Sequence, residues 1–332
     1  MDLITRRRLL SLLGIGGGIY VSESLGARRL LAQTKTRLSI LTGGTGGVYY
    51  PLGGGMAALI SKYLQGVEAT AEVTTASVDN MKFIHTGKAA LALTLPDTAL
   101  DAYEGKLKGL PEKVAVRTLA ALYSNYMHFV TLEGSGIKRI PDLKGKRVST
   151  GSPGSGTEVK GLRVMEAYGL TPKDLRSQDR LGVGESAGAL KDRKIDAFIW
   201  DGGLPTAAIL DLAATPGIKV YIIPHDDAVP KMVAKYGPLY FAAPIPKGVY
   251  PGVESDTPVA VATNLLVAHE RMEEPLAYQI TKAILERTEE LVAVHKAAKE
   301  ITLKSAVLGS PVPFHPGALR YYKEKGVKVP AI

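Results

Sequence analysis

The sequence predicts an α/β protein of two similar lobes, and a repeated glycine-rich segment is the main observation behind this prediction. Residues 42–47 (TGGTGG) and 150–156 (TGSPGSG) lie 108 positions apart, and each stands between a run typical of a β-strand and a segment typical of a helix. A second matching pair, at residues 87–93 and 193–199, has a helix end that gives way to a buried strand. The repeat indicates two lobes, each with a glycine-rich loop at the carboxyl end of its first strand, where open α/β sheets bind ligands. We therefore expect a ligand in a cleft between the facing loops.

The length and composition fit two globular domains. The chain has 332 residues, of which 45% are hydrophobic and 22% charged, as expected for two domains with their own cores. It contains no cysteine, which excludes disulfides, thiol catalysis and cysteine-ligated metals. The formal net charge of +9 favours anionic partners. Because Lys and Arg are spread without a dense basic run, we expect no nucleic-acid binding.

The sequence pattern of residues 1–32 predicts an export signal that is not part of the fold. Arg6 and Arg7 precede an apolar stretch at 9–21 that is too short to span a bilayer stably. This pattern is typical of a twin-arginine signal, and an ordinary secretory signal with an arginine-rich start is the alternative. Cleavage near Ala32 would remove five arginines and two acidic residues and lower the net charge to about +6. The protein is then expected in the periplasm or another extracytoplasmic space.

Hydrophobic patterns and capping residues place the elements of each lobe. In the first lobe we expect strands at residues 38–42, 69–75 and 89–95, with helices at 52–64 and 78–86. In the second lobe we expect a helix at 158–168 and another that starts with a capping box at 171–174. From residue 274 onward the spacing of apolar residues predicts mostly helix.

Two crossings between the lobes are predicted, as in a clamshell with two hinges. A long apolar run at residues 119–132 would carry the chain into the second lobe, and runs at 219–223 and 239–242 would carry it back. The expected division is lobe I at 36–124 plus 243–332 and lobe II at 125–242.

The second glycine-rich loop has the chemistry of an anion site. Ser152, Ser155 and Thr157 place hydroxyls beside free amide groups at a helix N-terminus, which favours a carboxylate. A tight turn with self-capping hydroxyls is the alternative. Asp97 and Asp201 each follow an expected strand end, where a carboxylate would attract an ammonium group or cap a helix.

Nucleotide and metal sites are not predicted. A dinucleotide fingerprint would need a third glycine where Tyr49 stands, and a phosphate loop would need Lys-Ser/Thr where Thr157 and Glu158 stand. The six histidines never occur at metal-ligand spacing. We therefore expect no cofactor and no metal.

Residues 184–188 (GESAG) match the G-x-S-x-G pattern of a serine nucleophile. A nucleophile elbow needs a strong strand before it, a long helix after it and an oxyanion loop upstream, and none of these is predicted around Ser186. A secreted serine hydrolase that uses Ser186 with His295 or His315 is therefore kept only as an alternative.

Six segments resemble the TAXI solute-binding proteins of TRAP transporters. They occur in order and cover nearly all of the chain after the signal: GTGGVYYP at 44–51, SVDN at 77–80, DLKGKRV at 142–148, GSGTE at 154–158, IDAF at 195–198 and HPGALRYY at 315–322. The resemblance implies a two-lobed periplasmic-binding-protein (Venus-flytrap) fold. It also implies a receptor that closes on glutamate or a related acid and delivers it to an ion-gradient-driven TRAP permease. The receptor of an ATP-driven importer would share the fold and differ in its partner.

The motif positions and the loop chemistry together give the expected ligand-binding residues. Trp200 and Asp201 lie where the family is less uniform, and an aromatic residue followed by a carboxylate suits an amino acid or a neutral ring better than a simple diacid. The full expected set is Thr45, Gly46, Gly47, Tyr49, Ser77, Asn80, Asp97, Ser152, Ser155, Gly156, Thr157, Trp200 and Asp201.

Overall fold

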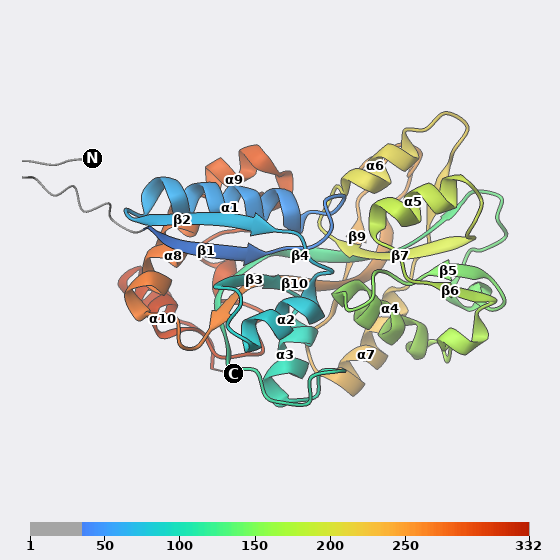
Figure 1. Ribbon diagram of the computed structural model, residues 1–332. Helices are drawn as coiled ribbons and strands as arrows, with labels where there is room; N and C mark the ends of the chain where they lie inside the picture. The colour runs from blue at the N-terminus through green and yellow to red at the C-terminus, as the bar shows by residue number, and fades with distance from the viewer. Residues whose placement is uncertain (1–34, 332) are drawn as a thin grey trace, which may run out of the picture. The chain divides into compact units, whose positions relative to one another are not determined.

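A computed structural model describes residues 35–331, which form one sheet with helices on both faces (Figure 1). The strand order is β2-β1-β3-β10-β4-β7-β5-β6, with β8 paired to β4 and β9 paired to β10. The export signal expected at residues 1–32 lies outside the described residues. Within the part described, no helix has the length and apolar character needed to cross a bilayer.

One half of the sheet is built from the first three strands. β1 pairs in parallel with both β2 and β3. The strands and the helices that connect them are β1 (Thr36–Leu41), α1 (Tyr49–Tyr63), β2 (Val67–Glu72), α2 (Ser77–His85), β3 (Leu91–Thr94) and α3 (Pro96–Glu104).

The other half repeats this arrangement, with β5 parallel to both β6 and β7. Its elements are β5 (Arg147–Ser149), α4 (Gly156–Ala167), β6 (Ser177–Asp179), α5 (Val183–Lys191), β7 (Ala197–Gly202), α6 (Ala207–Ala213), β8 (Val220–Ile222), α7 (Val229–Tyr236) and β9 (Phe241–Ile245). The repeat of parallel strand, loop and helix predicted from the sequence is therefore present.

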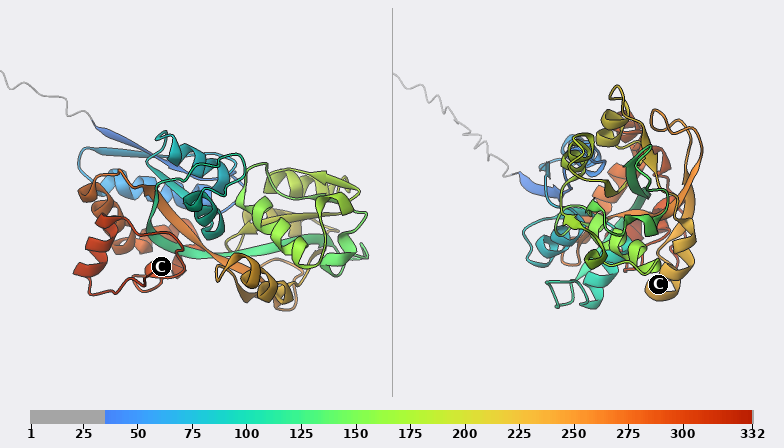
Figure 2. Two further views of the ribbon diagram at one scale, coloured as in Figure 1. Left: turned by 90° about the horizontal axis from the view of Figure 1, so that it is seen from below. Right: turned by 90° about the vertical axis from the view of Figure 1, so that its right-hand side faces the viewer.

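Two long antiparallel strands, β4 (Val116–Leu132) and β10 (Thr257–His269), connect the halves (Figure 2). The far end of β4 pairs with β7 and β8, whereas the far end of β10 pairs with β3. Fourteen of the 17 residues of β4 are buried, as expected for a strand covered on both faces. The chain ends in three helices on the first half, α8 (Glu274–Glu286), α9 (Thr288–Val294) and α10 (Pro316–Glu324).

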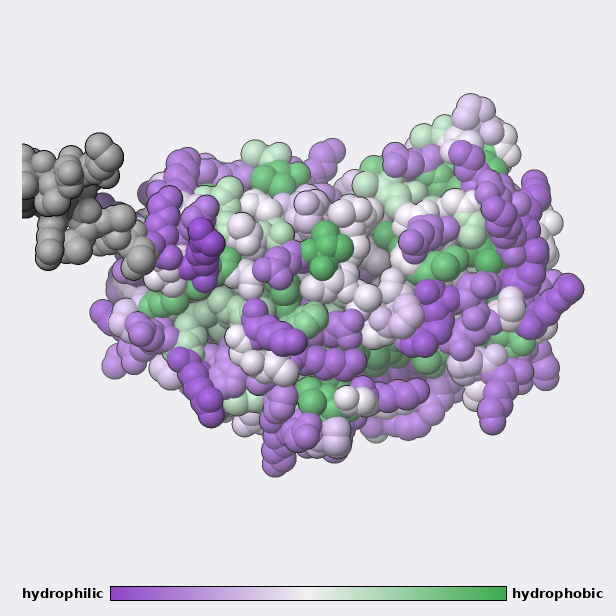
Figure 3. Space-filling view, in the orientation of Figure 1, coloured by the Kyte–Doolittle hydropathy of each residue, from purple (hydrophilic) through white to green (hydrophobic). Residues whose placement is uncertain are grey.

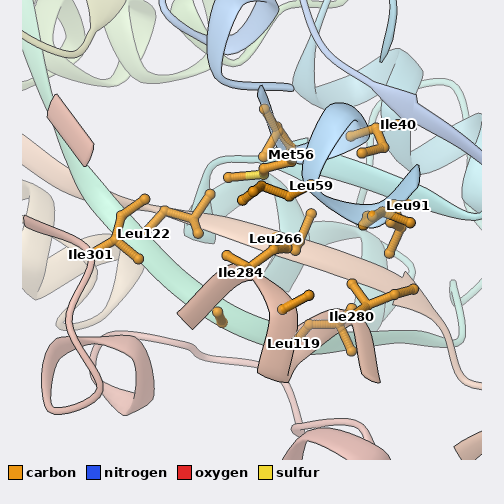
Figure 4. Close-up of a cluster of buried hydrophobic side chains, with 14 of the residues drawn as sticks. Ile40, Met56, Leu59, Leu91, Leu119, Leu122, Leu266, Ile280, Ile284 and Ile301 are labelled. Carbon is orange, nitrogen blue, oxygen red and sulfur yellow. The ribbon is translucent and has the colours of Figure 1, made fainter. Parts of the chain in front are cut away.

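Each half has its own hydrophobic core on both faces of the sheet. On the first half, α1, α8, α9 and α10 cover one face, where Met56, Leu266 and Ile284 pack together (Figure 4), and α2 and α3 cover the other. On the second half, α4 and α7 cover one face and α5 and α6 the other. Each buried aliphatic side chain stabilises the fold by roughly 1.5–3 kcal/mol. We call these halves lobe I and lobe II.

The return crossing differs from the expected one. The runs at 219–223 and 239–242 form β8 and the start of β9, and the chain returns to lobe I along β10. Residues just after 242, such as Ile245, Tyr250 and Val253, belong to a lobe II core, so this part of the expected boundary needs correction. Which residues move together as a lobe stays a prediction.

The helix expected after the capping box at 171–174 is also shorter than predicted. The box is present, but it starts only a 3₁₀ turn, Pro172–Asp174. Leu175 is extended and leads directly to β6. Ser177, the first residue of β6, pairs with Arg147 of β5, so the short segment before it leaves no room for further helical turns.

Candidate functional site

A cavity lies between the two glycine-rich loops and is lined by residues of both lobes. It contains about 590 Å³ of space between the atoms, a figure that includes space open to solvent. In Figure 3 the surface is mostly hydrophilic at both ends of the molecule and less hydrophilic between them. The lining residues are Gly43, Gly44, Gly47, Val48, Tyr49, Thr75, Ala76, Ser77, Leu95, Tyr123, Asn125, Gly151, Ser152, Ser155, Gly156, Thr157, Leu181, Gly182, Val183, Trp200, Asp201 and Gly202.

Four helices begin at this cavity, two from each lobe. The lining includes the first residues of α1, α2, α4 and α5. The first N–H groups of a helix have no partner within it, and the helix dipole adds partial positive charge there. Ser155 caps α4 by accepting from the N–H of Glu158 at 3.1 Å, while the lining residues Gly156 and Thr157 start that helix. This end of the cavity suits an anion.

Asp201 supplies the opposite charge from the end of β7. Its side chain is fully buried, and Oδ1 accepts from Lys160 Nζ at 2.8 Å. Within the part of the chain that the structure describes, its other oxygen, Oδ2, has no hydrogen-bond partner, and the buried hydroxyl of Tyr123 has none either. Burial raises the pKa of the Asp201 carboxyl, and the ammonium of Lys160 opposes that shift. Two unpartnered polar atoms thus belong to residues that line one cavity, which is costly without a ligand or water.

A buried hydrogen-bond network connects the cavity wall to both crossing strands. Asn125 on β4 and Asn264 on β10 exchange two amide hydrogen bonds of 2.8 Å. Tyr49 donates to Asn264 Oδ1 at 2.5 Å, and Lys160 Nζ donates to the carbonyl of Asn125 at 3.2 Å. Burial raises the pKa of Tyr49, so its hydroxyl remains protonated and donates. The network ties the start of α1 and the interior of α4 to the place where the chain changes lobes.

Two glycines allow the lobes to approach across the cavity. A Cβ atom on Gly47 of lobe I would lie 2.7 Å from the ring of Trp200 in lobe II. A Cβ atom on Gly156 of lobe II would lie 2.5 Å from Leu95 Cδ1 and 2.6 Å from Ser77 Oγ in lobe I. Each glycine therefore makes room for a side chain of the opposite lobe.

Nine of the residues expected at a ligand site line this cavity: Gly47, Tyr49, Ser77, Ser152, Ser155, Gly156, Thr157, Trp200 and Asp201. Four others do not. Thr45 is exposed, and Gly46 lies against Val183 and Ala208 of lobe II. Asn80 is fully buried and donates to the carbonyls of Thr42 and Leu93. Contact of these residues with a ligand stays a prediction, and the structure places all three outside the lining of this cavity.

Asp97, the fourth, forms a contact between the lobes outside the cavity. It accepts from Tyr240 at 2.8 Å and lies 3.4 Å from Arg163 Nη1, both in lobe II. Arg163 also donates to Asp101 on α3 at 2.5 Å, and its guanidinium stacks on the ring of Tyr236. The expected ammonium partner of Asp97 is thus replaced by an arginine of the same chain.

Sequence reasoning missed several residues that shape the site. Tyr123 and Asn125 lie in a run that predicts only a crossing strand, and nothing in its pattern marks which residues face a ligand. Lys160 sits in α4 where a lysine normally faces solvent, and its partner Asp201 is 41 positions away. The segment just before the G-x-S-x-G motif also lines the cavity, through Leu181, Gly182 and Val183.

The structure gives that segment no catalytic arrangement. Ser186 is fully buried within α5, with its Oγ 2.8 Å from Ser149 Oγ. His295 contacts the carbonyl of Pro205 and His315 accepts from the N–H of Gly317, so neither is a hydrogen-bond partner of Ser186. The hydrolase alternative lacks its base. Over residues 35–331, no cluster of three or more His, Asp or Glu side chains is placed to hold a metal ion.

The paired lobes, the two crossing strands and the cavity between them form a two-lobed α/β fold of the periplasmic-binding-protein type. The chain belongs to the NMT1-like family, whose model matches residues 40–326.

The solved structures to which this chain is similar are distant in sequence. A protein from Bordetella bronchiseptica RB50 aligns with a TM-score of 0.52 and 19% identity over 87% of this chain and 89% of its own. The periplasmic aliphatic sulphonate binding protein SsuA from Escherichia coli gives 0.45 and 13% over 87% and 83%. The alkanesulfonate-binding protein SsuA from Xanthomonas axonopodis pv. citri, bound to MOPS, gives 0.48 and 14% over 88% and 91%.

Proposed function

We propose that this protein is an extracytoplasmic receptor that closes on a small carboxylate or amino acid and delivers it to a membrane permease. The observation that carries the proposal is the cavity between the lobes. It combines helix N-termini from both lobes with an acceptor, Asp201 Oδ2, and a hydroxyl, Tyr123 Oη, that have no hydrogen-bond partner among residues 35–331. A ligand that bridges the lobes satisfies both ends and favours the closed arrangement.

Ser152, Ser155 and the first N–H groups of α4 would hold the carboxylate, and Ser77 faces them from lobe I across Gly156. Tyr49 and Trp200 would enclose the ligand from the two lobes. No chemical step is needed, and one closing event per ligand is expected.

Delivery to a TRAP-type permease rests on the resemblance to TAXI proteins. It is tested by uptake in cells that carry this receptor with a candidate permease. Loss of uptake when the ion gradient is collapsed supports the proposal. Uptake that continues without the gradient and needs ATP would instead assign the receptor to an ATP-driven importer.

Export through the twin-arginine route is the localisation we propose. Changing Arg6 and Arg7 together to Lys is expected to keep the protein in the cytoplasm, because paired arginines identify that signal. Cell fractionation measures the outcome. Normal export of the double variant would indicate the general secretory route.

Ligand binding is tested by a thermal-shift screen of amino acids and carboxylates against the exported protein. A ligand at a hundred times its Kd stabilises the folded state by about 2.7 kcal/mol, and its melting temperature rises accordingly. The proposal fails if no compound of either class shifts the melting temperature at millimolar concentration.

A further inference from the structure

The charges of the cavity define its ligand more narrowly. We infer that the site takes an α-amino acid with an uncharged, apolar side chain, which carries no net charge at neutral pH. This inference rests on the proposed function and departs from the glutamate-like ligand that the family resemblance implies.

The first step is the charge of the lining. Among the described residues that line the cavity, Asp201 alone carries a charged side chain, and Lys160 behind it neutralises that charge. No lining Lys or Arg is therefore present in residues 35–331 to pair with an acidic ligand side chain. A buried charge without a partner is costly, so a second carboxylate on the ligand would weaken binding.

Two of the four helix N-termini already have acceptors. The carbonyl of Gly154 accepts from the N–H groups of Val78 and Asp79 at the start of α2. Glu185 Oε2 accepts from the N–H of Gly182 at the start of α5, at 2.8 Å. The loop before α1 lies against the Trp200 ring at Gly47. At the start of α4, Ser155 accepts from the N–H of Glu158, and we assign the one carboxylate to the N–H groups of Gly156 and Thr157 and to the hydroxyls of the neighbouring serines.

The acceptor for an ammonium group lies beside that place. The backbone N–H of Asp201 donates to Thr157 Oγ1 at 3.2 Å, which joins the end of β7 to the first turn of α4. In an α-amino acid a single carbon separates the carboxylate from the ammonium group, so adjacent sites suit both. Asp201 Oδ2 only accepts hydrogen bonds, and an ammonium group has three N–H donors. We assign one of them to Asp201 Oδ2 and another to Tyr123 Oη, which also has no partner among the described residues.

One part of the remaining wall of the cavity is apolar. It is formed by Val48, Leu95, Leu181, Val183 and the Trp200 ring, whose Nε1 donates to Thr206 Oγ1 at 2.9 Å. With its only donor already bonded, Trp200 presents carbon to the ligand. An aliphatic or aromatic side chain buries apolar area there, at roughly 25 cal/mol per Å².

Titration calorimetry with the purified exported protein tests this inference. The neutral ligands are L-valine, L-leucine and L-phenylalanine, the acidic ligand is L-glutamate, and 4-methylpentanoate is L-leucine without its amino group. We expect the tightest neutral amino acid to bind at least tenfold more strongly than L-glutamate. L-leucine should bind at least tenfold more strongly than 4-methylpentanoate.

The outcomes separate the inference from the function on which it rests. Binding of L-glutamate as tight as that of the best neutral amino acid would overturn the inference and leave the receptor function standing. Equal binding of L-leucine and 4-methylpentanoate would overturn the ammonium assignment. If none of the five compounds nor any other amino acid or carboxylate binds, the proposed function itself fails.

Two variants locate the ammonium group. Tyr123→Phe removes only an unpartnered hydroxyl and is expected to fold, and it should reduce the preference for L-leucine over 4-methylpentanoate several-fold. Asp201→Asn should abolish that preference. Because Asp201→Asn leaves Lys160 buried without its counter-ion, its melting temperature is measured alongside. The assignment is refuted if the preference for L-leucine over 4-methylpentanoate is unchanged in Tyr123→Phe and in an Asp201→Asn variant that still folds.

Discussion

The two glycine-rich loops are similar in sequence and differ in what each supplies to the cavity. The loop at 42–47 leads into α1, which has no side-chain cap, and its threonine, Thr45, is exposed. The loop at 150–156 leads into α4, where Ser155 caps the helix and is 5% exposed. Polar recognition of an anion is therefore concentrated in the lobe II loop, whereas the lobe I loop contributes mainly backbone and space.

The two loops share the use of a glycine for close approach. Gly47 admits Trp200 from lobe II, and Gly156 admits Leu95 and Ser77 from lobe I. The contacts are reciprocal, so each loop limits how far the other lobe can close. Ligand affinity in a two-lobed receptor depends on the free energy of closure as well as on the contacts to the ligand. Variants in the two loops can separate these contributions.

The largest effect is expected from Gly156→Val. Its added atoms would meet Leu95 Cδ1 and Ser77 Oγ at distances near 2.5 Å, shorter than van der Waals contact, so the closed arrangement would be blocked. Ligand affinity measured by calorimetry should fall at least a hundredfold, and small-angle scattering should show no compaction on adding ligand. Gly184→Ala, at a glycine with no atom near its Cβ position, is the control. Affinity within threefold of the wild type in Gly156→Val would show that closure does not pass through this contact.

The second effect compares the hydroxyls of the two loops directly. Ser155→Ala removes a cavity hydroxyl and the α4 cap that accepts from the N–H of Glu158. Because a hydrogen bond to a charged group contributes about 1.5–3 kcal/mol, ligand affinity should fall roughly ten- to a hundredfold. The lost cap should also lower the free energy of unfolding by about 1 kcal/mol. Thr45→Val, in contrast, should bind like the wild type because Thr45 is exposed. Calorimetry and urea unfolding measure both variants, and a comparable loss of affinity in Thr45→Val would contradict the assignment of the anion to lobe II.

Much of the fold could be predicted because hydrophobic periodicity and glycine loops are local signals. The run at 119–132 matches the far part of β4, and the loop, helix and strand pattern is present in both lobes. β10 was missed because Pro258, Thr263 and Asn264 interrupt its apolar run and no glycine loop marks it. Asn264 sits at an irregularity in the pairing with β4, a feature set by the partner strand and not by local sequence.

The site was predicted in outline and missed in its electrostatics. Glycine motifs identified the two loops, but they do not state which side chains turn inward, and Thr45 and Asn80 were placed at the ligand for that reason. The Lys160–Asp201 ion pair and the Asp97–Arg163 contact join residues more than 40 positions apart. Such pairs depend on how α3, α4 and β7 pack, and a single sequence holds no local sign of them.

Gly47→Ala tests the lobe I loop and should have a smaller effect than Gly156→Val. The clash is with the Trp200 ring, whose Cη2 and Cζ2 would lie 2.7 and 2.9 Å from the new Cβ, and an aromatic ring at the cavity can tilt at some cost. Affinity should fall about tenfold. In Gly47→Ala/Trp200→Phe the smaller ring should recover part of the loss, and a double-mutant cycle measures that coupling. If the two substitutions are simply additive, Gly47 and Trp200 do not meet in the bound state.

The smallest effect is expected from the interlobe contact that belongs to neither loop. Arg163→Gln removes the cation shared by Asp97 and Asp101, but Asp97 keeps its hydrogen bonds from Tyr240 and from the N–H of Thr98. The side chain of Arg163 is 13% exposed and that of Asp97 is fully buried, so water replaces little of the interaction. Because Asp97 keeps two hydrogen bonds, the closed form should lose about 1 kcal/mol, roughly fivefold in affinity.

Lys235→Gln is the matched control for Arg163→Gln. It breaks an ion pair with Glu166 on the same helix, α4, but one that stays within lobe II. It should therefore leave the affinity unchanged, because opening and closing do not alter that pair. Equal effects of the two variants on the Kd would mean that positive charge in lobe II acts on the ligand at a distance and that the Asp97–Arg163 contact plays no part in closure. A second outcome is a loss of affinity in Arg163→Gln but not in Lys235→Gln. If that loss adds to the loss caused by Ser155→Ala in the double variant, lobe closure and anion binding contribute independently to affinity.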